Sequence, residues 1–247
     1  MEKMSLNKKE MKVFLFRFFS FYFLIGLPFV LGAEISDLKD KGKAGLVSYN
    51  LASSVNYLVD IEPINKDRTV NVVVEIPAGT TQKWEISKTD GSIKREVLKG
   101  KPRTIDYIGY PGNYGIVPMT LLPKYRGGDG DPVDVLLLGP SAERGNVVSG
   151  KVIGRLNLID NGEIDHKLIA VQRNSTLFVV NNIAELDQKF PGISKIIETW
   201  FANYKGYGKV KTNGFSGVKE SMIMLQESVV EFKKESLLKE RPNLQYE

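Results

Sequence analysis

Three carboxylates stand within six residues of the stretch 127–139, GGDGDPVDVLLLG: Asp129, Asp131 and Asp134. A solvated turn would explain the first two, because Asp, Gly and Pro are typical turn residues. It does not explain Asp134, which stands at the start of an apolar run that reads as a buried strand. A buried carboxylate needs a cation or strong hydrogen-bond donors beside it. The spacing therefore predicts that such groups lie against this stretch.

The composition restricts which cation that can be. The chain has no cysteine and a single histidine, His166, which excludes disulfides, thiol nucleophiles, zinc-cysteine sites and multi-histidine sites. A calcium loop of the EF-hand type does not fit, because counting from Asp129 puts Val133 at its fifth position and Pro140 at its twelfth. A metal bound here must have oxygen ligands, which favours magnesium, calcium or manganese. His166 itself is interpreted as an exposed or packed residue without a chemical role.

A second acidic group follows in LIDNGEIDHKLIAV, where Asp160 and Asp165 flank a predicted turn and Lys167 comes two residues after Asp165. Strand alternation puts Asp165 and Lys167 on one face and His166 on the other. Carboxylates and a lysine are costly to bury singly, but together they suit a site that binds a metal and a phosphate.

A third group lies upstream in EIPAGTTQKWEIS, with Glu75, Lys83 and Glu85, of which the last two share a strand face. Further polar candidates are Arg103 in KGKPR, Tyr114 in GNYG, and Tyr204 and Lys205 in WFANYKGYG. Each of these side chains, taken alone, is more often structural or solvated than functional. The combination is what points to a site.

The elements that must position these residues are mostly strands. Strand patterns cover VNVVVEIPAG, KWEISKTDGSI with its Asp-Gly turn, VDVLLLG, LFVVNNI and a hairpin around an Asn-Gly turn, NVVSGKVIGRLNLID-NGE-IDHKLIAVQR. Apolar residues at helical spacing predict a helix over 193–204, and GVKESMIMLQESVVEFKKE predicts a second. Many short strands with frequent turns are typical of a small, closed or nearly closed barrel. The predicted fold is therefore mainly β with α: a β-barrel flanked by two helices.

The N-terminal segment predicts export. Residues 1–33 carry five basic and two acidic residues, hence +3 of the total charge of +5, which leaves about +2 for the rest. The 14-residue apolar block Phe18–Leu31 is short for a membrane span and is followed by small residues ending at Ala33, as in a secretory signal peptide. We expect a periplasmic or secreted protein; the alternatives are a cytoplasmic or an N-terminally membrane-anchored one. Residues 34–68 form a lead-in of unknown role, and 69–247 the main domain.

From about residue 70 to 211 the chain resembles the soluble inorganic pyrophosphatases of family I. The resemblance rests on VVVEIPAG, KWEI, KGKPR, GNYG, DGDPVDVL, DNGEIDHK and FANYKGYG, in that order. It implies a five-stranded, OB-like closed barrel whose mouth binds several Mg²⁺ ions. It also implies hydrolysis of pyrophosphate to two orthophosphates by metal-activated water, in a homo-oligomer.

The resemblance also implies a role for each matching residue. Asp131 matches the general base. The metal ligands implied are Asp129, Asp134, Asp165, Asp160, Glu75 and Glu85, and the phosphate-binding residues are Lys83, Arg103, Tyr114, Lys167, Tyr204 and Lys205. Asn161 departs from the pattern, because an acidic residue usually follows the position of Asp160, and this puts an outer metal site in doubt. KGKPR and the longer loop LLPKYRGG resemble the eukaryotic branch of the family more than the short bacterial form, which leaves a dimer and a hexamer open.

Two other classes of protein compete with this interpretation. A barrel that binds divalent cations without catalysis would have lost catalytic positions, yet Asp131, Lys83, Arg103 and Tyr204 are all present. An OB-type nucleic-acid binder would be strongly basic, with exposed aromatic residues among the cations. The charge of about +2 outside residues 1–33 and the acidic clusters count against it. The expected partner is therefore pyrophosphate, with no nucleic acid and no stable membrane association once the signal peptide is removed.

Overall fold

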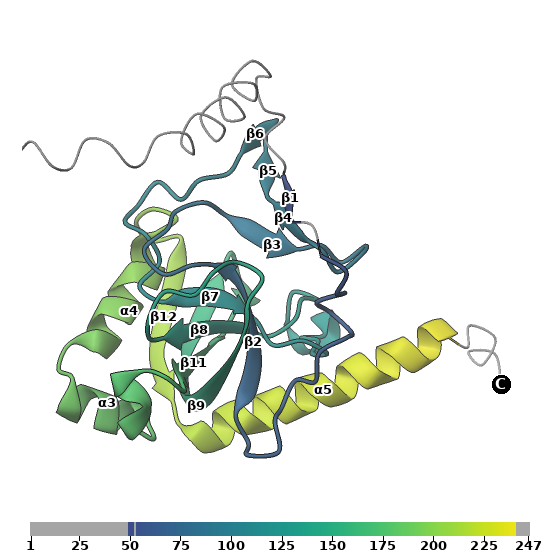
Figure 1. Cartoon of the computed structure of the whole chain (residues 1–247). Coiled ribbons are helices and arrows are strands. Elements are labelled where there is room, and N and C mark those ends of the chain that lie inside the picture. The colour runs from purple at the N-terminus through teal and green to yellow at the C-terminus, as the bar shows by residue number, and fades with distance from the viewer. Residues whose placement is uncertain (1–48, 52, 241–247) are drawn as a thin grey trace, which may run out of the picture. The chain divides into compact units, whose positions relative to one another are not determined.

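The computed structural model describes residues 49–51 and 53–240 (Figure 1). The predicted signal peptide and residues 34–48 of the lead-in lie outside the described residues. The described part is mainly β, as predicted, with a few helices. Its main sheet contains β2 (Val70–Ile76), β7 (Asn113–Ile116), β8 (Asp134–Leu138), β9 (Val147–Asp160), β10 (Glu163–Ile164), β11 (Lys167–Gln172) and β12 (Val210–Ser216).

The pairing of the main sheet follows the order β9–β11–β8–β7–β2, and β2 pairs with β9 as well as with β7. Only β8 and β11 run parallel among these pairs. β9 is 14 residues long, so it can pair with β2 near its start and with β11 and β12 farther along. This long strand ties the first and last strands of the domain together.

Two predicted strand-turn-strand units are confirmed. Asn161 and Gly162 join β9 to β10 with φ of 49° and 90°, the left-handed conformation that a two-residue hairpin requires. β3 (Trp84–Ile86) and β4 (Ile93–Arg95) pair across the Asp-Gly turn, and β1 (Asn50–Leu51) completes a three-stranded sheet beside them. A further small hairpin, β5 (Val97–Leu98) with β6 (Lys101–Pro102), follows.

The continuous apolar run of β8 is explained by burial on both faces. Leu136 and Leu138 pack in one cluster, together with the aromatic residues of α4, whereas Val135 and Leu137 pack in a second cluster. A strand buried on both sides needs no polar alternation. Consequently Asp134 at its start is the one polar residue of the strand, and it stands where the core gives way to a cavity.

The described residues contain three α-helices, and two of them were predicted. α4 (Ile193–Asn203) buries Ile197, Trp200 and Phe201, and α5 (Val218–Glu240) follows β12. In Figure 1, α3 and α4 lie together at one side of the main sheet and α5 runs beneath it. No helix of the described residues is long and apolar enough to cross a membrane.

The prediction of a strand at 177–183 is wrong. The prediction of two helices is also wrong, because the described residues contain three α-helices. Residues Thr176–Val179 form a 3-10 turn, and a short third helix, α3 (Ile183–Lys189), comes next. The reason is local capping, which competes with a strand. The Ser175 side chain accepts a hydrogen bond from the backbone at Leu177, and the Asn182 side chain accepts one from the backbone at Glu185.

Residues 49–51 and 53–68 belong to the same compact unit as the main domain. Tyr57 is buried with Ile86 and Ile93 of the three-stranded sheet, and Ile64 forms a β-bridge with Val70. This part of the lead-in therefore supports the hairpin that carries Lys83 and Glu85.

Candidate active site

The predicted site residues all line two adjoining cavities of about 200 and 560 Å³. The two cavities share three wall residues, Lys83, Tyr114 and Asp134. The smaller one also has Arg103, Asp129, Asp160, Asp165, Lys167, Tyr204 and Lys205 on its walls, and the larger one Glu75, Glu85 and Asp131. Residues from seven separate segments of the sequence thus meet in one place.

Parallel pairing explains how the centre of the site is assembled. In the register of β8 with β11, Val135 lies opposite Leu168, so the first residues of the two strands, Asp134 and Lys167, come together. The Lys167 ammonium donates to the carboxylates of both Asp134 and Asp165. Asp165 and Lys167 face one cavity while His166 faces elsewhere, which confirms the predicted alternation.

Lys167 is charged although its side chain is only 3% exposed. Burial lowers the pKa of Lys167, but the carboxylates of Asp134 and Asp165 outweigh burial and hold it well above its usual range. This ammonium is a fixed positive charge at the meeting point of the two strands.

Several carboxyl groups of the site have raised pKa values, and burial is the first cause in each. Burial raises the pKa of Glu75 to about 7, against the lowering effect of Lys83. Burial and the neighbouring Asp134 raise the pKa of Asp129, and burial raises that of Asp165 even beside Lys167. The site therefore holds more buried negative charge than its own lysines neutralise, which is what a cation would relieve.

Asp131 occupies the loop before β8 and is less enclosed. Its backbone N–H donates to the Asp129 carboxylate at 2.9 Å, and its backbone carbonyl accepts from Leu122 at 2.8 Å. Its carboxylate forms an ion pair with Lys88, a residue that the sequence analysis did not single out. The loop therefore fixes the two acidic residues by backbone contacts, while the Asp131 carboxylate stays at the edge of the larger cavity.

The carboxylates fit a hard divalent cation by their donor chemistry. All ligands available are oxygens, and one of them, Oδ1 of Asp160, is buried without a hydrogen-bond partner while Oδ2 accepts from Lys205. Among the described residues, no three acidic or histidine side chains are arranged to coordinate one metal ion. Lysine ammonium groups pair with several of the carboxylates instead. By the type of their donor atoms, these residues fit a hard metal such as Mg²⁺.

Other wall residues of the two cavities carry groups that suit phosphate. Burial lowers the pKa of Lys83, but Glu75 and other acidic neighbours raise it overall, so its ammonium stays charged. Burial raises the pKa of Tyr114 and of Tyr204, so both hydroxyls remain neutral donors. Tyr204 follows the end of α4, with its ring stacked on Trp200 at 4.7 Å between centroids.

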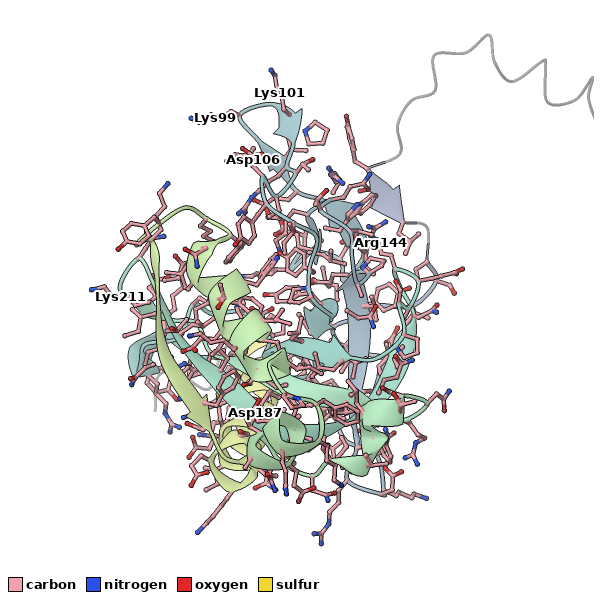
Figure 2. The ribbon with its side chains drawn as sticks, turned by 90° about the vertical axis from the view of Figure 1, so that its left-hand side faces the viewer. Lys99, Lys101, Asp106, Arg144, Asp187 and Lys211 are labelled. Carbon is pink, nitrogen blue, oxygen red and sulfur yellow. The ribbon has the colours of Figure 1, made fainter. Side chains whose placement is uncertain are left out.

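Arg103 is the member of KGKPR that lines the cavity. Lys99 and Lys101 point away from the protein at the tip of the β5–β6 hairpin (Figure 2). The Arg103 guanidinium instead turns inward and donates to both carboxylate oxygens of Glu96 at 2.8 and 3.0 Å. Glu96 holds the guanidinium in place beside the cavity.

Tyr110 is a wall residue that the sequence analysis missed. It is buried, lines the smaller cavity, and packs on Tyr114 and Trp200 with centroid distances of 5.1 and 4.4 Å. Its place in YPGNYG, four residues before Tyr114, is the only signal that could have pointed to it.

Comparison with known proteins identifies the family. The family model described as Pyrophosphatase: Inorganic pyrophosphatase matches residues 72–233. This chain belongs to the inorganic pyrophosphatase family. It is 42% identical over 157 residues to an inorganic pyrophosphatase of Drosophila melanogaster. The match covers 57% of this chain and 46% of the fly protein. It is 33% identical over 192 residues to the chloroplastic soluble inorganic pyrophosphatase 1 of Chlamydomonas reinhardtii, covering 70% and 68% of the two chains.

Solved pyrophosphatase structures share the fold. The type I inorganic pyrophosphatase from P. falciparum superposes with a TM-score of 0.71 at 25% identity, over 78% of this chain and 68% of that one. A truncated vacuolar soluble pyrophosphatase of Trypanosoma cruzi in complex with PPi gives 0.64 at 28% identity, over 75% and 76%. This chain spans about half the length of several sequence relatives, for example 46% of the fly protein and 54% of the mitochondrial enzyme of Saccharomyces cerevisiae.

Proposed function

We propose that this pyrophosphatase family member hydrolyses inorganic pyrophosphate to two orthophosphates with the help of several Mg²⁺ ions. The observation that carries the proposal is the convergence of two opposite sets of side chains on adjoining cavities. One set is acidic and suits metal; the other is cationic or phenolic and suits phosphate. The names of the relatives and the PPi complex of the Trypanosoma cruzi protein support the choice of substrate.

The acidic set would hold the metal ions. Its members are Asp129, Asp134, Asp165, Asp160, Glu75 and Glu85. Bound Mg²⁺ would neutralise charge on both phosphoryl groups and lower the pKa of the attacking water. Asn161 at the rim of the smaller cavity offers an amide where the family usually has a carboxylate, so an outer metal site is weaker here.

The second set would bind the substrate. Arg103 offers its fork of donors to one phosphoryl group, whereas Lys83, Lys167 and Lys205 act as point charges on the leaving phosphate. Tyr114 and Tyr204 donate hydrogen bonds without adding charge. The buried position of Lys83 and Tyr114, shared by both cavities, would orient the substrate across them.

In the chemical step, the oxygen of water forms a bond to one phosphorus while the bond from that phosphorus to the bridging oxygen breaks. The bridging oxygen leaves with the electron pair as part of the second orthophosphate. Asp131 accepts the proton that the water loses, which is possible because its carboxylate lies at the edge of the larger cavity. Lys88 forms an ion pair with this carboxylate and would position it beside the cavity.

We further propose a five-stranded closed barrel of β2, β7, β8, β9 and β11 as the frame of the site. The pairing of β2 with both β7 and β9 supports this. The pyrophosphatase domain would comprise residues 69–247 and the enzyme would be a homo-oligomer.

The proposed location is outside the cytoplasm, with residues 1–33 removed as a signal peptide. Its support is the basic, apolar and small-residue order of those residues. Relatives named as mitochondrial and chloroplastic proteins make an organelle leader the main alternative. Sequencing the N-terminus of the protein purified from its native cell would decide: an intact Met1 in the cytosolic fraction would refute export.

The test of the activity is phosphate release from pyrophosphate with Mg²⁺ by the wild type, Asp131→Asn and Asp187→Asn. Asp187 is an exposed residue of α3, away from both cavities, and its substitution controls for the loss of one carboxylate (Figure 2). We expect Asp131→Asn to lose about 100-fold or more of kcat and Asp187→Asn to keep it. Mg²⁺ binding without turnover in all three proteins would favour the metal-binding module instead. Salt-dependent binding of single strands would favour the nucleic-acid binder.

A further inference from the structure

A third cavity lies behind the loop that carries Asp129 and Asp131. It has a volume of about 210 Å³ and opens between that loop, β9, the β10 hairpin and α5. Its apolar wall is formed by Leu121, Leu122, Pro123, Ile164 and Met224. Neither the proposed reaction nor the fold requires a hollow here.

Two side chains of this cavity, Arg155 and His166, have donor groups without an acceptor among the described residues. The guanidinium of Arg155 uses only its Nε, which donates to Asn157 at 3.0 Å, and it makes no ion pair within the described part of the chain. His166 accepts a hydrogen bond from the backbone of Leu158 through Nδ1, so Nε2 carries the imidazole proton and is left to donate. Both residues line the cavity.

The acidic residues of the cavity wall are already engaged. Glu231 accepts from Tyr125 and Lys234, each at 2.8 Å, and Arg126 lies 3.7 Å from Glu227 and 3.8 Å from Glu231. Arg155 is the cation of this cavity with no carboxylate at ion-pair distance in the described part of the chain. Burial lowers the pKa of Arg155, and its acidic neighbour Glu220 raises that pKa against burial but forms no ion pair with it. A small pocket with an apolar wall and a few convergent donors is the usual form of a ligand site.

We propose that this cavity is a second ligand site, for a small monocarboxylate with one apolar ring or branched chain. The carboxylate binds Arg155 and the Nε2–H of His166, and the apolar part packs on Leu122, Ile164 and Met224. The volume lies below the ~300–1,000 Å³ of sites for drug-sized molecules, which limits the occupant to about one ring.

The site is mechanically connected to the proposed metal ligands. Leu122 offers its side chain to the cavity, while its backbone N–H donates to Asp131 and its carbonyl accepts from Gly130, both at 2.8 Å. His166 stands between Asp165 and Lys167 in the chain. A ligand here is therefore expected to change the affinity for Mg²⁺, and Mg²⁺ to change the affinity for the ligand by the same factor. This linkage rests on the proposed function; the binding itself does not.

The binding is tested on the metal-free full chain without pyrophosphate, with benzoate as the probe. His166 is the single histidine, so its imidazole proton gives one unambiguous NMR signal. We expect a saturable shift of that signal with benzoate and at least about 10-fold weaker binding of the uncharged isostere benzamide, as the loss of a charged hydrogen bond implies. A shift that does not saturate, or equal affinity for the two probes, would overturn the proposal.

Variants then locate the binding. Arg155→Met should weaken benzoate binding at least about 10-fold. Arg173→Met, which lies just after the far end of β11, should leave it unchanged. Met224→Trp fills the cavity without removing a charge and should also block binding, which covers the case in which Arg155→Met does not fold. Benzoate affinity that survives both cavity variants would place the ligand elsewhere. Repeating the titration with Mg²⁺ should change the affinity by about 5-fold or more; an identical affinity would refute the linkage alone.

Discussion

Lys167→Met should destabilise the metal-free protein by about 3 kcal/mol. The substitution keeps the length of the side chain but removes the ammonium that neutralises Asp134 and Asp165. Breaking a buried ion pair by deleting one partner costs ~3–5 kcal/mol. We expect the lower end, because the two carboxylates are 20% and 18% exposed and water can solvate them in part.

In a chain of this size, ~3 kcal/mol corresponds to a fall in Tm of about 6–12 °C. The fall should depend on pH in a defined direction. Without Lys167, the pKa of Asp165 in the folded state rises further above the ordinary value of about 3.9, so the folded state is penalised increasingly as pH rises above that value. The difference in Tm between the wild type and Lys167→Met should therefore be small near pH 4 and largest near pH 8.

Differential scanning calorimetry in EDTA measures both effects, with Lys195→Met as the control. Lys195 is 76% exposed and paired only with Glu198 on the surface, so its substitution should change Tm by less than about 2 °C. Added Mg²⁺ should raise the Tm of Lys167→Met more than that of the wild type, because it restores the missing positive charge. A Tm of Lys167→Met equal to that of the wild type at pH 8 would refute the electrostatic account of the site.

Three further substitutions test other parts of the structure. Asn113→Ala should cost ~2–4 kcal/mol in urea denaturation, because its buried side chain accepts from two backbone N–H groups at 3.1 and 2.8 Å; a loss below about 0.5 kcal/mol would contradict this. Gly115→Ala should prevent folding, since its Cβ would lie 1.8 Å from the Val73 carbonyl oxygen; a native circular-dichroism spectrum would show the pairing to be wrong. Arg103→Lys should lower kcat/KM for pyrophosphate about 10–100-fold because the fork is lost, and an unchanged kcat/KM would remove Arg103 from the site.

Strands with a clear pattern were predictable because their cause is local. The valine-rich run of β2 and the Asn-Gly turn after β9 identify their elements without any tertiary information. The strand β7 was not predicted, because its NYGI sequence is short and contains Gly115, where the strand crosses close to Val73. β12 was missed for a related reason: its polar sequence VKTNGFS becomes a strand by pairing with β9.

The site residues could be named from the sequence because their motifs keep their order, but their contacts could not. The approach of Lys167 to Asp134 depends on a parallel pairing between strands 33 positions apart. Tyr110 and Lys88 enter the site through tertiary packing and have no pattern of their own that marks them. The cavity behind the loop that carries Asp129 and Asp131 likewise arises from the placement of α5 against β9.

The most direct test of the central claim is the stoichiometry and metal dependence of the reaction in water labelled with ¹⁸O. Purified protein is given pyrophosphate with Mg²⁺, and in parallel with EDTA, and the phosphate produced is analysed by mass spectrometry. The account predicts two orthophosphates per pyrophosphate, with one ¹⁸O atom incorporated into one of the two. It predicts no release of phosphate in EDTA. Mg²⁺ binding without phosphate release, or release that is unaffected by EDTA, would contradict it.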